Sequence, residues 1–128
     1  MTSPLEKLLV DTRELDAQLV ADVLEPYVRI DKNSREIRGT QSWAKLTVQQ
    51  RALAYLLARK AMVALDLLPP EEEGARPIHM ETSIGAQGNV LRKALSVLYK
   101  RRLVDKRGRS YYIPNHSVEA VKASLLPA

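Results

Sequence analysis

The chain has 128 residues, of which 45% are hydrophobic and 27% are charged, and its formal net charge at pH 7 is +5. This length suits one domain, or one domain with an appended element, and leaves no room for a separate catalytic domain. Because the sequence contains no Cys, it excludes a disulfide framework, a thiolate metal site and a cysteine nucleophile.

The first 42 residues predict a helix and a β-hairpin that extend the main domain. From Leu5 to Leu24, apolar residues recur at the three-to-four spacing of one helical face, and Pro26 ends the pattern. Residues 27–38 then form two short alternating segments around an Asp-Lys-Asn-Ser turn. We expect a small hairpin there, closed by Gly39.

Residues 43–128 form the predicted main domain and begin with the strongest helix signal in the chain. Thr47 is a suitable N-cap, good helix formers continue to Leu68, and two prolines follow. Because the apolar residues cover more than one face, we expect this helix to lie at the centre of the domain. The next segment, residues 69–77, contains three consecutive Glu and a Gly, which predicts a solvated loop.

Two helices joined by a glycine turn are predicted next. A short helix spans Met80–Ile84, residues 85–88 form the turn, and a second helix spans Asn89–Arg102. One face of the second helix is apolar and consists of Leu91, Ala94, Leu95 and Leu98. This arrangement is a helix-turn-helix unit.

The chain then predicts a two-stranded ribbon and a last helix. Leu103–Val104 and Tyr111–Ile113 are the expected strands, joined by a basic turn at residues 106–110. Alternation along the second strand places one of its two Tyr rings inward and the other outward. Asn115 or Ser117 is the expected N-cap of the last helix. The apolar side of that helix consists of Val118, Val121, Leu125 and Leu126.

Positive charge is concentrated in the second helix of this unit and in the ribbon. Between Asn89 and Pro114, eight Lys or Arg residues stand against one acid, Asp105, so this segment carries +7 and the remainder of the chain −2. A basic patch of this kind favours a polyanion, because each Lys or Arg beside a phosphate releases condensed counterions. The pattern therefore predicts a nucleic-acid partner.

The order of elements from Trp43 to the C-terminus resembles a winged helix-turn-helix domain. The resemblance rests on Val90–Leu95, Leu98 and Arg102–Val104, which match a recognition helix that ends in a small residue, Leu and a branched aliphatic residue. Here Arg102 replaces the small residue, usually Gly, which removes the easiest left-handed C-cap. The superfamily includes MarR-like, PadR-like and GntR-like regulators, and the resemblance implies a mainly α fold with a small β component.

The resemblance also implies that the helix from Asn89 enters the major groove of double-stranded DNA, while the wing contacts phosphates or the minor groove. Asn89 and Gln87 can pair with adenine edges, and Lys93 and Arg92 can reach guanine or phosphate. The two arginines that flank Gly108 suit a narrow minor groove. The candidate DNA-contacting residues are Gln87, Asn89, Val90, Arg92, Lys93, Ser96, Lys100, Arg101, Lys106, Arg107 and Arg109.

We expect a small transcriptional regulator that acts as a homodimer. The helices Leu5–Leu24 and Ser117–Leu126 each offer an apolar face that the domain need not bury entirely. Terminal helices form the dimer contacts in MarR-like and PadR-like regulators, so the resemblance implies the same here. A dimer would contact two half-sites about one helical turn apart.

No enzyme or metal site is predicted. His79 and His116 lack a carboxylate or a second histidine at ligand spacing, and Glu71–Glu73 lack the alternating oxygen ligands of a calcium site. We find no nucleophile beside a base, and we predict no cofactor. The acidic loop and the long helix could frame a small-molecule pocket, but no polar constellation marks one, and an effector is left open.

Neither export nor a membrane span is predicted. The first 16 residues place acids where a signal peptide needs an uncharged apolar run. The most apolar segment, Leu53–Leu68, is interrupted by Arg59, Lys60 and Asp66, and such charges are costly at the centre of a bilayer. We expect a cytoplasmic protein, associated with the nucleoid if its source is prokaryotic.

Three alternatives stay open at this stage. The basic cluster at residues 92–109 can be simply a solvated face. Winged helices also serve as protein-interaction modules in larger nucleoprotein assemblies, and the hairpin Tyr27–Arg38 or the helix Leu5–Leu24 could then be the docking surface. RNA could bind the same basic face, although an aromatic stacking platform is missing.

Overall fold

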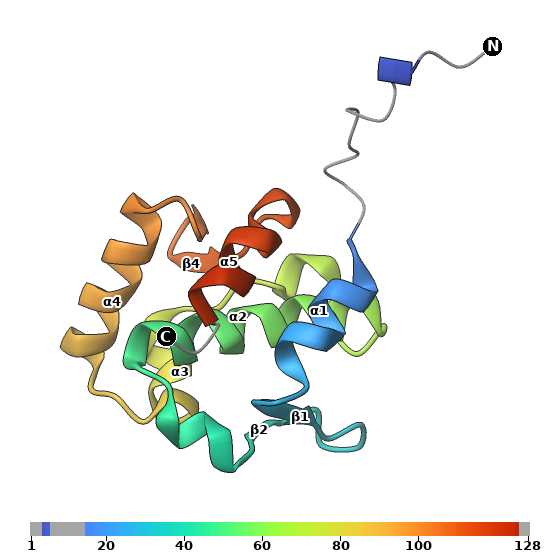
Figure 1. The fold of residues 1–128 in the computed structure, drawn as a ribbon. Helices are drawn as coiled ribbons and strands as arrows, with labels where there is room; N and C mark the ends of the chain where they lie inside the picture. Colours follow the sequence, from blue (N-terminus) through green and yellow to red (C-terminus); the bar gives the residue numbers. More distant parts are fainter. Residues whose placement is uncertain (1–3, 6–14, 126–128) are drawn as a thin grey trace.

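The structure is a computed structural model that describes residues 4–5 and 15–125. These residues form mainly helices, with two small antiparallel sheets of two strands each (Figure 1), which confirms the predicted mainly α fold. The elements are α1 (Ala17–Leu24), β1 (Val28–Ile30), β2 (Ile37–Gly39), α2 (Val48–Ala64), α3 (Pro77–Ile84), α4 (Gly88–Lys100), β3 (Asp105–Arg107), β4 (Ser110–Tyr112) and α5 (Val118–Leu125). None of the helices in the described ranges has both the length and the apolar composition that crossing a bilayer requires.

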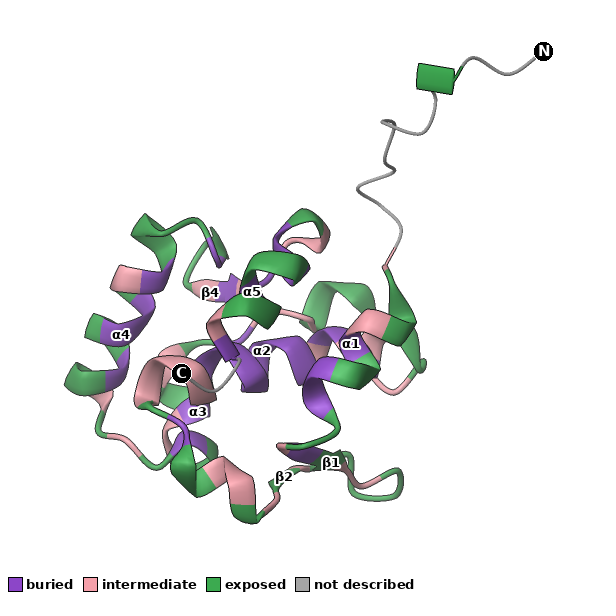
Figure 2. Ribbon diagram, viewed as in Figure 1, coloured by how far each residue is buried: buried purple, intermediate pink, exposed green. Residues whose placement is uncertain are grey.

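Helix α2 lies at the centre of the fold, as its composition predicts. Figure 2 shows it buried along much of its length, and α1, α3, α4 and α5 all pack against it. Every residue from Ala52 to Ala58 is buried. The predicted N-cap is confirmed: the Thr47 hydroxyl accepts a hydrogen bond from the Gln50 N–H at 3.1 Å, and the Gln50 side chain accepts one from the Thr47 N–H at 2.9 Å.

Helix α2 ends at Ala64, before the predicted end at Leu68. Asp66 adopts a left-handed conformation with a φ of 60°, and the Leu67 N–H donates to the Met62 carbonyl at 2.8 Å. These are the features of a Schellman C-cap, formed here without Gly. This C-cap, and not the two prolines that follow it, therefore ends the helix.

The N-terminal extension packs on the same core as the rest of the chain. Helix α1 is capped by the Asp16 carboxylate, which accepts a hydrogen bond from the Leu19 N–H at 3.0 Å. The helix buries Val20, Val23 and Leu24. These side chains belong to one hydrophobic cluster with those of α2 and α5, so a boundary at residue 42 stays a prediction. Residues 6–14 of the predicted first helix lie outside the described residues.

The predicted β-hairpin is confirmed, and β1 and β2 have three residues each. Its register pairs Val28 with Gly39. Gly39 is required by close packing, because the first carbon of a side chain there would lie 2.5 Å from Cγ of Trp43. The Tyr27 hydroxyl donates a hydrogen bond to the Leu125 carbonyl at 2.9 Å, which ties the start of the hairpin to α5.

Helices α3 and α4 form the predicted pair of helices joined by a glycine turn. Helix α3 begins at Pro77 rather than Met80, because Pro is favoured in the first turn of a helix. Gly85 ends it in the left-handed conformation, with a φ of 75°. Helix α4 begins at Gly88, and its buried face consists of the four predicted residues, Leu91, Ala94, Leu95 and Leu98.

The prediction of a solvated loop between α2 and α3 is wrong in part. Residues 70–72 form a short 3-10 helix, and Ala75 is buried. The backbone of Ala75 pairs with that of Tyr111 through two hydrogen bonds of 2.9 Å, which places a third extended segment beside β4. The Arg59 side chain donates to the carbonyls of two glutamates in the same segment. A bridge of one residue leaves no periodic pattern in a sequence, so pattern analysis misses it.

The ribbon begins later than predicted. Leu103 and Val104 are buried and precede β3, and the turn between the strands is shortened to residues 108–109. The cause is Arg102, which adopts the left-handed conformation with a φ of 63° despite not being Gly. The Leu103 N–H donates to the Leu98 carbonyl at 3.0 Å, so the chain turns sharply and directs Leu103 and Val104 into the core.

Asn115 and Ser117 use their side chains differently from the predicted N-cap role. The Asn115 side-chain oxygen accepts a hydrogen bond from the Lys60 ammonium at 2.6 Å, and the Ser117 hydroxyl donates to the Arg102 carbonyl at 3.2 Å. Both residues lie in a 3-10 helix that leads directly into α5. Helix α5 buries the predicted Val118, Val121 and Leu125, whereas Leu126 lies outside the described residues.

Candidate functional site

The outer face of α4 is the centre of the predicted DNA-contacting surface. All eleven candidate residues are exposed. Asn89, Lys93, Ser96 and Lys100 are spaced three or four residues apart, so they follow one another along one side of the helix, with Arg92 beside them. Figure 2 shows this outer side exposed and the opposite side of α4 buried. The helix therefore presents a continuous polar and basic face.

The start of α4 also brings an acid to this surface. The first carbon of a side chain at Gly88 would lie 2.3 Å from Oε1 of Glu81 and 3.2 Å from Nη1 of Arg92. The carboxylate of Glu81 on α3 thus lies beside the first turn of α4, where the helix dipole favours a negative charge. Asn89 accepts a hydrogen bond from the Val90 N–H at 2.9 Å and keeps its amide NH₂ as a donor.

A surface hollow of about 430 Å³ lies between the first half of α4 and the start of α2. Its lining consists of Thr47, Val48, Gln49, Val90, Lys93, Ala94 and Val97. The structure therefore places Gln49 beside two of the candidate residues, Val90 and Lys93. The sequence analysis missed Gln49, because only the packing of α2 against α4 brings it to this surface.

The basic residues in the last turn of α4 have different neighbours from those in its first turns. The Arg101 side chain donates a hydrogen bond to the Ser124 hydroxyl at 3.4 Å, which directs it toward α5. Lys100 lines a second hollow, of about 410 Å³, that Val104 and His116 also line. The structure thus places Arg101 and Lys100 at the edge of the candidate surface, where they can add positive charge.

The ribbon is held against α4 by a cation over two rings. The Lys106 ammonium lies 5.7 Å from the centre of the Tyr99 ring on α4 and 5.2 Å from the centre of the Tyr111 ring on β4. Lys106 and Tyr111 are directly paired across the strands, so they share one face of the ribbon. These contacts fix the ribbon beside the end of α4, while Lys106 itself remains exposed.

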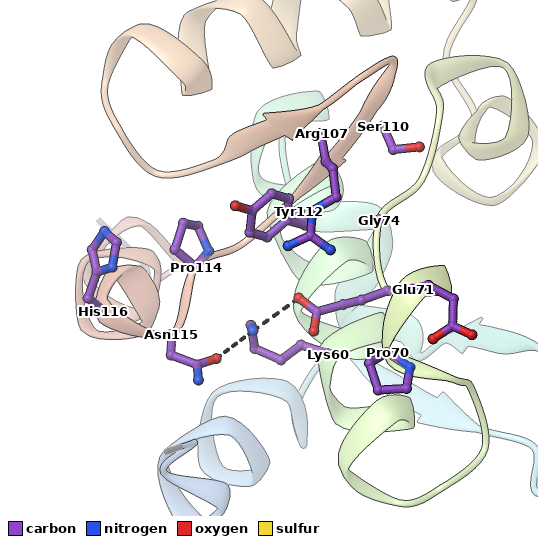
Figure 3. Close-up of a pocket in the computed structure, with 11 residues that line it drawn as sticks. Lys60, Pro70, Glu71, Gly74, Arg107, Ser110, Tyr112, Pro114, Asn115 and His116 are labelled. Carbon is purple, nitrogen blue, oxygen red and sulfur yellow. Dashed lines mark hydrogen bonds and ion pairs between the residues drawn. The ribbon is translucent and has the colours of Figure 1, made fainter. Parts of the chain in front are cut away.

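Arg107 lies on the opposite face of the ribbon, because successive residues of a strand point to opposite sides. Its guanidinium lies 5.0 Å from the centre of the Tyr112 ring. It lines a cavity of about 380 Å³ together with residues of α2 and of the acidic segment between α2 and α3 (Figure 3). Arg107 still flanks Gly108 as expected, since β3 ends at Arg107, and the structure adds that its side chain lines this cavity.

The tip of the ribbon is open. Gly108 has a φ of 64°, and a side chain there would meet no atom within 4 Å. Positive φ at the first of two turn residues is typical of a type II′ hairpin turn, for which Gly is preferred. Arg109, the second turn residue, is exposed and is the candidate cation that stands nearest the tip.

Lys60 is the other residue that the sequence analysis overlooked as a site residue. It lies on α2 with a relative exposure of 6%, paired with Glu73 at 3.0 Å and hydrogen-bonded to Asn115. The signal in the sequence was a lysine inside the apolar Leu53–Leu68 segment. Because a buried lysine requires a partner, that position indicates an ion pair even before the fold is known.

Nothing in the described ranges groups three or more His, Asp or Glu side chains in a geometry that could hold a metal ion. His79 and His116 are both exposed. The comparisons of the chain with protein-family models, with curated proteins and with solved structures find no match.

Proposed function

We propose that the chain is a double-stranded DNA-binding protein of winged-helix type that acts as a small transcriptional regulator. In this proposal α4 enters the major groove with its outer face. The ribbon formed by β3 and β4 is the wing, and it contacts the phosphate backbone or the adjacent minor groove. Residues 43–125 supply both parts from one hydrophobic core.

The observation that carries the proposal is the division of α4 into two faces. One face is apolar and buried, which fixes the helix rigidly on α2 and α3. On the other face, the side chains of Lys93 and Ser96 make no hydrogen bond or ion pair with any residue in the described ranges. A rigid helix with an exposed face of unpaired donors and positive charge has the chemistry that base edges and phosphates require.

The contacts divide by position along the helix. Asn89, Arg92 and Lys93 lie in its first turns, where side chains can reach base edges, and so they would determine sequence preference. Lys100 and Arg101 lie at the far end and would contact phosphates, which fixes the register without selecting a sequence. The ribbon would contribute Lys106 and Arg109, since Arg107 lies on the opposite face of the ribbon from Lys106 and lines the cavity there.

We also propose a homodimer, but on a different surface from the two terminal helices on which the sequence placed it. The described parts of α1 and α5 already bury their apolar residues within the chain. An apolar hollow of about 350 Å³ remains between α1, β1 and the end of α2, where Leu65 is 62% exposed. This hollow is the surface on which a second copy would have to pack.

The same hollow favours a second candidate function, a protein-interaction module in a larger nucleoprotein assembly. Its lining includes Leu15 and Val20 of the N-terminal extension and Ile30 at the end of β1, so it lies where the helix and hairpin were predicted to dock a partner. Binding at this surface would be apolar. Its affinity would therefore depend little on salt.

One experiment separates the two functions. Fluorescence anisotropy would measure binding of the chain to a randomised DNA pool about 30 base pairs long, which accommodates two half-sites one turn apart. Affinity should fall by orders of magnitude between about 50 and 200 mM salt, and sequencing of the bound fraction should show an enriched motif. A palindromic motif would support the homodimer. If binding is weak and no motif is enriched, the DNA proposal fails and the interaction module becomes the better description.

A further inference from the structure

A polar cavity lies on the side of the ribbon that faces away from α4. Its volume is about 380 Å³, and Figure 3 shows residues from α2, from the acidic segment after it, and from the ribbon around one hollow. The side chains that matter for its chemistry are Lys60, Glu71, Glu73, Arg107, Tyr112 and Asn115. This volume is at the lower end of the range for small-molecule sites, about 300 to 1,000 Å³.

One wall of the cavity is a fixed polar group. The Lys60 ammonium is 3.0 Å from Oε2 of Glu73 and 2.6 Å from Oδ1 of Asn115, and the Lys60 side chain is only 7% exposed. Figure 3 shows both contacts as dashed lines. Since Lys60 and Glu73 neutralise each other, this wall offers polar atoms without a net charge.

Two opposite charges on the cavity lining have no partner. Within the described part of the chain, the Arg107 guanidinium makes only its contact with the Tyr112 ring, and the Glu71 carboxylate makes no hydrogen bond or ion pair. The Asn115 amide NH₂ is also available, because only its oxygen accepts from Lys60. The cavity therefore combines one free cation, one free anion and neutral donors.

We propose that this cavity binds a small zwitterion of the α-amino acid class. Its carboxylate would pair with the Arg107 guanidinium in the two-pronged geometry that guanidinium groups favour. Its ammonium would pair with Glu71, whose exposed side chain would turn toward the hollow, because Figure 3 shows its carboxylate directed away from Arg107. The side chain of the amino acid would lie along the rings of Tyr112 and Pro114. A phosphate or a dicarboxylate fits less well, because Glu71, the free acid of the lining, offsets the charge of Arg107 and repels a purely anionic molecule. This site does not depend on the DNA proposal.

Isothermal titration calorimetry of the full chain against each of the common α-amino acids tests the proposal. At least one should bind with a saturable heat. Its N-acetyl derivative, which lacks the ammonium, and its methyl ester, which lacks the carboxylate, should each bind about 10- to 100-fold more weakly. Inorganic phosphate serves as the anionic control. If no amino acid binds, or if phosphate binds as tightly as the best amino acid, the proposal is overturned.

Variants locate the site. Arg107→Gln and Glu71→Gln should each weaken the best amino acid about tenfold or more, because each removes one of the two charge pairs. Arg76→Gln and Glu72→Gln are matched controls, since both residues are exposed in the segment between α2 and α3 and do not line the cavity. Their binding should equal that of the unmodified chain, with circular dichroism showing that every variant is folded. Equal weakening in the control variants would place the site elsewhere.

Discussion

The Nζ atom of Lys60 lies 3.0 Å from Oε2 of Glu73, and this ion pair joins the central helix α2 to the segment that precedes α3. The two partners are buried to different degrees: the Lys60 side chain is 7% exposed and that of Glu73 is 19% exposed. Loss of either partner leaves the other without its counter-charge. Water can reach the carboxylate more readily than the ammonium, so the two losses should differ in cost.

We therefore expect Glu73→Ala to lower the free energy of unfolding by about 3 kcal/mol, since it leaves a buried ammonium that is hydrogen-bonded to the neutral Asn115 side chain but has lost its counter-charge. Lys60→Met should cost about 1 kcal/mol, because an apolar chain replaces the lysine stem and Glu73 can be hydrated. Urea unfolding measures both. Glu72→Ala in the same segment is the control and should change stability by less than about 0.5 kcal/mol. An equal cost for both partners would contradict this account.

The backbone conformation of Arg102 costs conformational energy that Gly at this position would not. Its φ of 63° lies in the left-handed region, which is unfavourable for residues with a Cβ. Arg102→Gly should therefore raise the free energy of unfolding by about 1 kcal/mol, after allowance for the greater freedom of Gly in the unfolded chain. Thermal unfolding followed by circular dichroism measures the change.

The neighbouring Arg101→Gly is the matched control for Arg102→Gly. It removes the same charge, but Arg101 has a φ of −80°, which Arg adopts without strain. This variant should lower the free energy of unfolding by about 0.5 to 1 kcal/mol, because Gly adds freedom to the unfolded chain and the long, exposed hydrogen bond to Ser124 is lost. Stabilisation by both variants would indicate an effect of charge rather than of backbone conformation.

Sequence patterns predicted the parts of the fold that depend on neighbouring residues. The N-cap at Thr47 and the buried face of α4 follow from local hydrogen bonding and from the helical repeat, and both are confirmed. The pairing of Ala75 with Tyr111 depends on residues far apart in the chain, so no local pattern contains it. The same holds for the contact of Lys60 with Asn115.

The candidate site was predicted in part for the same reason. Exposure of the outer face of α4 follows from its periodicity, and all candidate residues on it are exposed. The direction of Arg107 depends on the register of the ribbon, and the predicted five-residue turn did not define that register. A shift of one residue moves a side chain to the opposite face of a strand. The left-handed turn at Arg102, after which the ribbon starts later than predicted, is formed without the Gly that usually marks such a turn in a sequence.

Asp31 should titrate below its ordinary range. Its carboxylate accepts hydrogen bonds from the N–H groups of Ser34 at 3.0 Å and Asn33 at 2.8 Å, and these lower the pKa of Asp31 from its ordinary 3.8, with a smaller effect of Arg38. Because the pKa is lowered in the folded chain, the stabilisation of the hairpin turn is present above pH 3.8 and is lost as the pH falls through the folded pKa. Titration of the Asp31 carboxyl carbon by NMR should give a midpoint below 3.8; a midpoint at or above it would contradict the hydrogen bonds.

The first turns of α4 should determine DNA sequence preference. We expect Asn89→Ala and Lys93→Ala each to weaken binding to the selected sequence by about 1 to 3 kcal/mol and to relax the preference at one position, because each removes a donor to a base edge. Competition anisotropy with selected and scrambled DNA measures both effects. Lys122→Ala is a charge-matched control for Lys93→Ala, since Lys122 is exposed on α5. If both α4 variants retain affinity and preference, α4 is not the recognition helix.

Arg109 and Arg107 are close in sequence, but the structure gives them different surroundings, and this difference tests the orientation of the ribbon. Arg109 stands at the open tip, whereas the guanidinium of Arg107 lies over the Tyr112 ring at the cavity. Arg109→Ala should weaken binding to all DNA sequences alike and reduce the slope of log affinity against log salt by about 1, because one phosphate contact is lost. Arg107→Ala should leave that slope unchanged. Measuring the slopes of both variants at several salt concentrations decides the matter, and a larger effect for Arg107 would mean that the opposite face of the ribbon meets the DNA.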